Sequence, residues 1–283
     1  MTRPDDRLAT SHPTVRRVAV LGAGTMGSGI AALLAEHGFA VRIADPSPDA
    51  RERALARVAK RAPDADVAAV AELEEAVAEA DLVIEAAPEV LALKEDLFRR
   101  VDAAAPAHAV LATNTSQLSV TALAATTGRA TQVCGMHWFN PPERMRLVES
   151  VRGLTSSDAT MAVVRSVAEA CGKTVVEVAD RQGFVTTRVL AATLVEAMRM
   201  HEEGVATAGD IDAAVKLGLN HPMGPLELAD YVGLDVMLAI ADSLTEALGE
   251  RFRPPQGLRK RVEAGQLGRK TGQGYHAYPP RAS

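Results

Sequence analysis

Residues 18–45 read VAVLGAGTMGSGIAALLAEHGFAVRIAD, and this stretch decides the fold class of the first half of the chain. Its apolar start is typical of a buried parallel strand, residues 28–37 of a helix, and residues 41–44 of a second strand. Gly22, Gly24 and Gly27 stand between strand and helix with the spacing GxGxxG, and Asp45 follows 21 residues after Gly24. A strand, a glycine turn, a helix and a distant acid in this order indicate a dinucleotide-binding unit.

Each residue of this motif has a physical role. Gly22 permits the tight turn, Gly24 lets the backbone approach a pyrophosphate, and Gly27 lets the helix pack closely on the strand. The start of the helix offers its N–H groups and its positive end to the phosphates. Asp45 would accept hydrogen bonds from the ribose hydroxyls and repel a 2′-phosphate, so we expect NAD to be preferred over NADP. The alternative is a glycine-rich turn that binds no ligand.

Further apolar runs predict strands at 81–86, 109–113, 133–136 and 174–178, whereas residues 46–80 read as mostly helical and charged. Strands that alternate with helices predict an α/β fold with a mostly parallel sheet. Ser116 and His137 follow two of these strands, at the carboxyl ends where open α/β sheets bind ligands. Ser116 could equally be the N-cap of a helix over 119–125.

Residues 133–150 read VCGMHWFNPPERMRLVES and place a histidine and a glutamate on two apolar segments joined by a loop. The two consecutive prolines force an extended or turning path, so we predict strand, loop and strand. If Glu149 met His137, its carboxylate would fix the tautomer of the imidazole and stabilise the imidazolium, as a general base requires. The structural alternative is a core histidine bonded to a carbonyl group and a solvated glutamate on an edge strand.

The composition of the 283-residue chain excludes several classes of protein. A net charge of −5 and an aromatic content of 3% argue against binding nucleic acid, and no apolar run is long enough to span a membrane. The start of the chain lacks the apolar segment of a secretory signal, so we expect a flexible arm at 1–16. Cys134 and Cys171 lack a metal-type spacing, which predicts no metal site and two free thiols in a reducing cytoplasm.

After Gly183 the pattern changes to helices only. The expected helices cover residues 184–203, 209–217, 226–231, 234–248 and 256–264. We therefore predict a Rossmann-like dinucleotide-binding domain over residues 17–181 and an all-α domain over residues 182–283.

Several motifs stand in the same order as in a known family. They are LGAGTMGSGIA, DLVIEAAPE followed by KEDLF, NTSQLS, GMHWFNP with LVE, HPMGPLELADYVGLD and LGRKTGQGY, and they extend from Val18 to Tyr278. The chain thereby resembles the L-3-hydroxyacyl-CoA dehydrogenases, including the bacterial 3-hydroxybutyryl-CoA type. The resemblance implies a Rossmann-like NAD domain followed by a helical domain through which subunits form a homodimer.

The resemblance also implies roles for particular residues. In the family a histidine, matched by His137, removes the 3-hydroxyl proton while hydride leaves C3 for the nicotinamide, and a carboxylate, matched by Glu149, stabilises the imidazolium. Ser116 matches the serine that contacts the substrate hydroxyl, Asn140 matches an asparagine near nicotinamide and substrate, and Thr187 stands at a substrate position. The expected cofactor contacts are Gly22, Gly24, Thr25, Met26, Gly27, Asp45, Glu89, Lys94, Asn114, Ser116 and Asn140.

Three departures from the family pattern concern the substrate. Thr187 stands in GFVTTR where the family usually has asparagine, and it loses the second bonding group and the reach of the amide. The 40 residues from Asp45 to Glu85 are fewer than in the family, whose long helical hairpin packs over the CoA end of the substrate. Glu143 and Arg144 replace mostly apolar residues beside the active site.

We therefore predict NAD-dependent oxidation of an L-3-hydroxyacyl thioester resembling 3-hydroxybutyryl-CoA. The short segment raises a second hypothesis, in which an acyl carrier protein of secondary metabolism carries a short or polar hydroxyacyl group. Arg51, Arg53, Arg57, Lys60 and Arg61 could meet an acidic carrier, although such a run is usually a solvated helix face. A third hypothesis is a non-catalytic NAD-binding protein.

Overall fold

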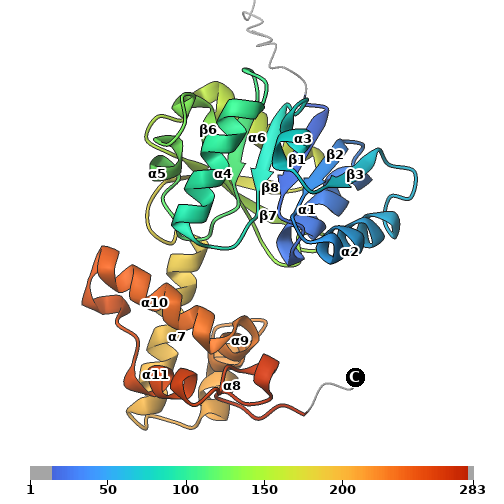
Figure 1. Ribbon diagram of the computed structural model, residues 1–283. Helices are drawn as coiled ribbons and strands as arrows, with labels where there is room; N and C mark the ends of the chain where they lie inside the picture. Colours follow the sequence, from blue (N-terminus) through green and yellow to red (C-terminus); the bar gives the residue numbers. More distant parts are fainter. Residues whose placement is uncertain (1–14, 280–283) are drawn as a thin grey trace, which may run out of the picture. The chain divides into compact units, whose positions relative to one another are not determined.

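The structure, a computed structural model, describes residues 15–279 and divides into two compact units between Asp180 and Arg181 (Figure 1). The first unit combines a mostly parallel sheet with helices, and the described residues of the second unit form helices, which confirms the predicted fold class. The arm expected at residues 1–16 lies outside the described residues except for its last two positions.

The first unit is built on one sheet of eight strands in the order β3-β2-β1-β4-β5-β6-β7-β8. Neighbouring strands are parallel except for β6 and β7, which are antiparallel. The order reverses at β1, which lies between β2 and β4, and a sheet of this kind binds its ligand at the carboxyl ends beside the reversal. The strands are β1 (Arg17–Leu21), β2 (Ala40–Ala44), β3 (Val67–Val70), β4 (Leu82–Glu85), β5 (Val110–Thr113), β6 (Val133–Trp138), β7 (Leu147–Arg152) and β8 (Thr174–Ala179).

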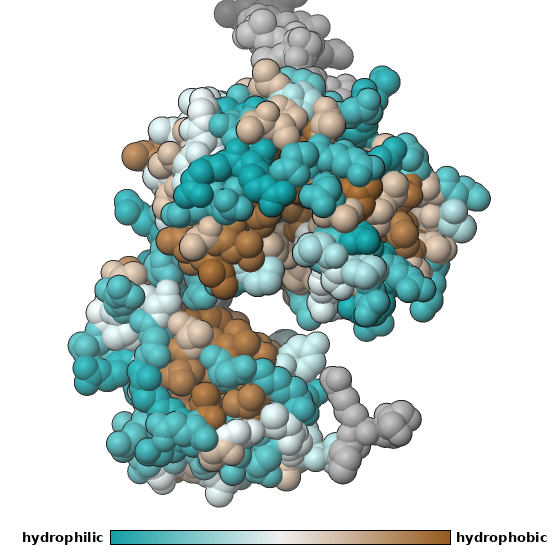
Figure 2. Space-filling view, in the orientation of Figure 1, coloured by the Kyte–Doolittle hydropathy of each residue, from teal (hydrophilic) through white to brown (hydrophobic). Residues whose placement is uncertain are grey.

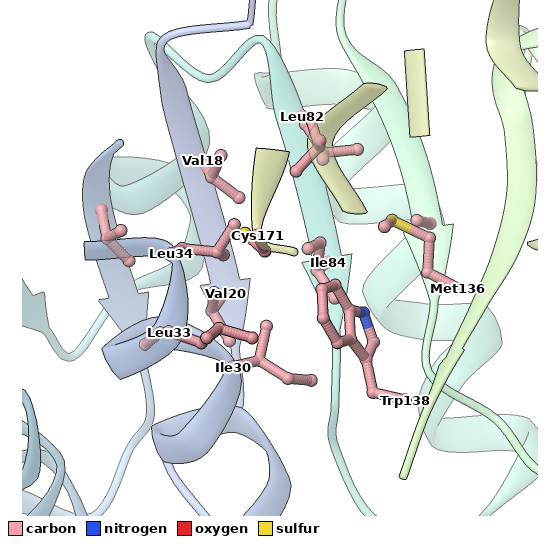
Figure 3. Packing of buried hydrophobic residues seen from close by; sticks show 14 of the residues in the cluster. Val18, Val20, Ile30, Leu33, Leu34, Leu82, Ile84, Met136, Trp138 and Cys171 are labelled. Atoms are coloured by element: carbon pink, nitrogen blue, oxygen red, sulfur yellow. The ribbon is translucent and has the colours of Figure 1, made fainter. Parts of the chain in front are cut away.

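Helices cover both faces of this sheet (Figure 1). On one face α1, α2 and α6 bury their apolar sides, and Figure 3 shows Ile30 and Leu34 of α1 packed near Val18 and Val20 of β1. Each fully buried aliphatic side chain of this kind contributes about 1.5–3 kcal/mol. The helices of the first unit are α1 (Thr25–Glu36), α2 (Pro48–Ala59), α3 (Leu73–Val77), α4 (Leu91–Ala104), α5 (Val120–Ala124) and α6 (Asp158–Ala170).

One local expectation was wrong, and one open alternative is excluded. Residues 46–80 are not mostly helical, because residues 67–70 form the edge strand β3, paired in parallel with β2. This strand, VAAV, is short and only partly buried, so alanine in a charged stretch hid its apolar pattern. Ser116 is not the N-cap of α5, since the hydroxyl of Ser119 accepts the hydrogen bond from the N–H of Ala122.

The second unit packs its helices around an apolar core that includes Leu194, Met198, Leu226 and Met237. Its helices are α7 (Thr186–Glu202), α8 (Ala208–Gly218), α9 (Pro225–Val232), α10 (Leu234–Leu248) and α11 (Gln256–Glu263). Within residues 15–279, no helix combines the length and apolar character needed to cross a membrane.

Candidate active site

The glycine turn between β1 and α1 is shaped for close approach of a ligand. Gly22 has a φ of 98°, and a Cβ there would lie 2.8 Å from the carbonyl oxygen of Ala86. A Cβ at Gly27 would lie 1.8 Å from the carbonyl oxygen of Gly22, so only glycine lets α1 pack this closely. A Cβ at Gly24 would meet nothing within 4 Å, which leaves open space beside the backbone for a pyrophosphate.

The N-terminus of α1 is suited to an anion. Its N-cap is Gly24, which has no side chain, whereas α2, α5, α6 and α8 are capped by the hydroxyls of serine or threonine. No acidic residue stands in the first turn, which Thr25 and Met26 begin. The N–H groups and the positive end of the helix dipole therefore attract a phosphate group.

Asp45 follows β2 and is held rigidly at the mouth of a cleft. Its Oδ2 accepts a hydrogen bond of 2.7 Å from the N–H of Ala23, and its Oδ1 accepts one of 2.9 Å from the N–H of Ser47. The cleft has a volume of about 540 Å³ and borders Gly22 as well. A fixed carboxylate there fits the ribose hydroxyls of NAD and opposes a 2′-phosphate.

The other walls of this cleft come from residues that the motif did not indicate. Leu73 of α3 and Leu93 and Leu97 of α4 line it with apolar side chains, which suit a flat adenine ring. Arg100 stands at its rim, 2.9 Å from Glu74, and this hydrogen bond lowers the pKa of the Glu74 carboxyl. The spacing of Leu93 and Leu97, one helical turn apart, was the signal that could have identified this wall.

His137 and Glu149 lie directly opposite each other on the antiparallel strands β6 and β7. The His137 Nδ1 atom lies 2.7 Å from Glu149 Oε2, and the two residues are 7% and 1% exposed. The carboxylate therefore holds the Nδ1–H tautomer, which puts the basic lone pair of the neutral ring on Nε2. Because Glu149 is buried on a strand between β6 and β8, it is not the solvated edge residue of the structural alternative.

Ser116 follows β5, the strand next to β6, and lies close to Glu89. Its N–H donates a hydrogen bond of 3.0 Å to Glu89 Oε1, and its hydroxyl oxygen lies 3.5 Å from the same atom. The hydroxyl of Thr115, which the sequence did not single out, donates to this atom at 2.5 Å. Glu89 therefore orients the segment that presents the Ser116 hydroxyl beyond the end of the strand.

Lys94 supports Glu89 from the interior. It is 0% exposed, and its Nζ lies 2.6 Å from Glu85 Oε1 and 3.4 Å from Glu89 Oε2. The second oxygen of Glu85 accepts a hydrogen bond of 2.7 Å from the hydroxyl of Thr113. A buried lysine is tolerated only with such partners. Lys94 therefore holds Glu89 in position from the interior, and its expected contact with the cofactor stays a prediction.

The remaining expected site residues occupy different settings. Asn114 Oδ1 accepts a hydrogen bond of 2.8 Å from the N–H of Trp138, which ties the end of β5 to β6 next to His137. Asn140 is exposed and precedes the cis peptide bond to Pro141. Thr187 is buried in the first turn of α7, in the second unit. The roles expected for these residues stay predictions.

The two cysteines, Cys134 and Cys171, are buried free thiols. Burial raises the pKa of each thiol to about 12. Both thiols therefore stay protonated at neutral pH and offer no nucleophile.

Two family models together match most of the chain. The model described as 3-hydroxyacyl-CoA dehydrogenase, NAD binding domain, matches residues 17–181, and the C-terminal domain of the same family matches residues 183–278. The chain belongs to the 3-hydroxyacyl-CoA dehydrogenase family. Its cofactor is NAD, as the glycine turn and Asp45 indicate.

Individual relatives agree with this assignment. A probable 3-hydroxybutyryl-CoA dehydrogenase of Bacillus subtilis is 45% identical to this chain, and the match covers 95% of this chain and 99% of the relative. The crystal structure of Mycobacterium tuberculosis FadB2 matches with a TM-score of 0.90 and 39% identity, over 94% of this chain and 100% of that one. The (S)-3-hydroxybutyryl-CoA dehydrogenase PaaH1 of Ralstonia eutropha matches with a TM-score of 0.89 and 39% identity, over 94% and 99% of the two chains.

Proposed function

We propose that this member of the 3-hydroxyacyl-CoA dehydrogenase family oxidises a short L-3-hydroxyacyl-CoA such as 3-hydroxybutyryl-CoA to the 3-ketoacyl-CoA. The observation that carries the proposal is the buried His137–Glu149 pair, with its 2.7 Å contact, on the sheet that also carries the glycine turn. The relatives from Bacillus subtilis and Ralstonia eutropha, both named for 3-hydroxybutyryl-CoA, support a short acyl group.

The geometry supports a separate role for each of these residues in the reaction. His137 Nε2 accepts the proton of the 3-hydroxyl group, and the Glu149 carboxylate stabilises the imidazolium that forms. The Ser116 hydroxyl would orient the substrate oxygen, and Asn140 would lie beside the nicotinamide of bound NAD. When bound, NAD supplies the acceptor for the hydride of C3.

We further propose that residues 17–181 form the cofactor domain and that residues 182–283 contribute to the substrate site and to a homodimer. Figure 2 shows apolar surface on the helical unit. An apolar groove of about 360 Å³ in this unit includes Val189, Leu190 and Leu228 in its walls. An exposed apolar groove on a helical surface is typical of a subunit contact. The enzyme is expected in the cytoplasm, where reduced thiols such as the buried pair here are the norm.

The carrier-protein hypothesis gains no support from the named relatives. The structure also weakens the argument for a basic surface that binds the carrier, because three of the five basic residues bond to other residues of the same unit. Arg51 donates to the carbonyl oxygen of Asp45 at 2.6 Å, and Arg57 and Arg61 form ion pairs with glutamates. Of the five, Arg53 and Lys60 are left to meet an acidic partner from this side.

Steady-state turnover tests the proposal. The wild-type protein is supplied with NAD and either 3-hydroxybutyryl-CoA or the same acyl group on an acyl carrier protein, and the formation of NADH is followed. Efficient turnover of the CoA ester is the expected result. Preference for the carrier-bound ester would establish the second hypothesis, and NADH binding without turnover of either ester would establish a non-catalytic protein.

A further inference from the structure

Glu143, one of the residues that departs from the family pattern, forms an ion pair that joins the loop after His137 to α2. Its Oε1 accepts hydrogen bonds from Arg57 Nε at 2.9 Å and from Arg57 Nη2 at 2.6 Å. The side chains of Glu143 and Arg57 are only 10% and 29% exposed, so solvent screens this pair less than an ordinary surface ion pair.

The same guanidinium also bonds the first turn of α1. Arg57 Nη1 donates to the carbonyl oxygen of Thr25 at 2.8 Å and to the hydroxyl of Ser28 at 3.0 Å. Gly29 makes this path possible, because a Cβ there would lie 2.8 Å from Arg57 Nη2 and 3.0 Å from Cδ of Pro142. One arginine therefore links the turn that receives the pyrophosphate to the loop that carries Asn140.

A second cation, the buried Lys173, holds the other side of this loop. Lys173 Nζ donates to the carbonyl oxygens of Pro142 and Met145 at 2.7 and 2.9 Å. Within the loop, the N–H groups of Arg144 and Met145 both donate to the carbonyl oxygen of Pro141, at 3.0 and 3.1 Å. Arg57 and Lys173 thus hold the loop from two sides. Of these two residues, it is Arg57 that also bonds to α1, the helix whose N-terminus is suited to the cofactor phosphates.

Arg57 lies in the short connection from β2 to β3. Its residues, 45–66, are all described and contain one helix, α2, where a long helical hairpin was the family expectation. We propose that the Arg57–Glu143 bridge positions Asn140 and the His137 strand end relative to the first turn of α1, and so aligns the proton acceptor with the cofactor. This role rests on the proposed function, since it concerns the same reaction.

The chain offers a matched control for the bridge. Arg61, four residues further along, places Nε and Nη2 at 2.9 and 2.5 Å from one oxygen of Glu36, at the far end of α1. This pair also joins the α2 region to α1 with the same geometry, but it does not contact the loop. Arg61→Gln with Glu36→Gln therefore removes a comparable ion pair and should leave turnover unchanged.

A double-mutant cycle on the holoenzyme tests the proposal. Glu143→Gln and Arg57→Met are each expected to lower kcat about threefold to tenfold. The double variant should be no slower than the slower of the two single variants, because both changes remove the same ion pair. Arg57→Met should also raise KM for NAD, since it frees the first turn of α1, whereas Glu143→Gln should not. Arg57→Lys, which keeps the charge without the fork, should restore part of kcat.

Hydrogen exchange gives a readout that does not depend on turnover. The amides of Arg144 and Met145 should exchange faster in Glu143→Gln than in wild type, with no change in the Arg61 and Glu36 variants. Multiplicative effects on kcat, or unchanged exchange in Glu143→Gln, would overturn the bridge while leaving the proposed function intact. If the wild-type protein fails to turn over any thioester, the proposed function fails and exchange alone decides whether the bridge holds the loop.

Discussion

Replacing Glu149 with glutamine should slow hydride transfer far more than it alters binding. The carboxylate lies 2.7 Å from His137 Nδ1, and both residues are buried. At an effective dielectric constant of about 20, opposite unit charges about 4 Å apart attract by about 4 kcal/mol. This attraction exists only once the imidazolium forms, and a tenfold rate change corresponds to about 1.4 kcal/mol, so kcat should fall about 10³-fold.

The amide that Glu149→Gln introduces would add to this loss. Its NH₂ group can donate to Nδ1, which moves the ring proton of His137 to Nε2 and removes the lone pair that accepts the substrate proton. Initial rates of NADH formation from 3-hydroxybutyryl-CoA measure the effect, and fluorescence titration with NADH confirms that the cofactor site is intact.

Glu177 provides the control for Glu149→Gln. It lies on the neighbouring strand β8 and pairs with Arg152 at 2.7 Å, away from the histidine. Glu177→Gln should keep kcat within about twofold of wild type, as expected for a surface ion pair. If Glu149→Gln lost less than tenfold in kcat while folded and able to bind NADH, stabilisation of the imidazolium by this carboxylate would be refuted.

Three further predictions concern cofactor choice and stability. Asp45→Asn, which removes the charge but keeps the shape, should narrow the preference for NAD over NADP by about tenfold or more, as measured by the ratio of kcat/KM values. Lys173→Met leaves the carbonyl oxygens of Pro142 and Met145 without their buried donor and should lower the free energy of unfolding by about 1–3 kcal/mol in urea titrations, whereas an unchanged midpoint would contradict this anchor. Burial raises the pKa of Asp81, but hydrogen bonds from two backbone N–H groups and a histidine lower it more, so the pKa in the folded state is below that in the unfolded state. The ionised carboxylate therefore stabilises the fold above about pH 4, and this stabilisation is lost in more acid solution. The Tm of Asp81→Asn should accordingly depend less on pH in that acid range than the Tm of wild type.

Local signals in the sequence were sufficient for much of the first unit. The glycine spacing and Asp45 predicted the turn, the helix and the cofactor. Each of these residues has a local role, either in the backbone conformation or as a charge, so a short stretch of sequence is enough to recognise them. The strand, loop and strand of residues 133–150 also followed from local patterns, and the antiparallel register then put His137 opposite Glu149.

Other features depend on contacts that no local pattern contains. The strand β3 was missed because VAAV is too short and too weakly apolar to differ from the helical residues around it. Lys94 was expected among the cofactor contacts, but its complete burial could not be predicted, because it depends on where the fold places Glu85 and Glu89. The Arg57–Glu143 bridge joins residues 86 positions apart, so only the fold reveals it.

The most direct test of proton removal by the His137–Glu149 pair is a single-turnover measurement on His137→Gln, mixed with NAD and 3-hydroxybutyryl-CoA. The dissociation constant for NADH should stay within about twofold of wild type, and the rate of hydride transfer should fall by about 10²- to 10⁴-fold. A variant that binds NADH normally and still transfers hydride at more than a tenth of the wild-type rate would show that another group takes the proton.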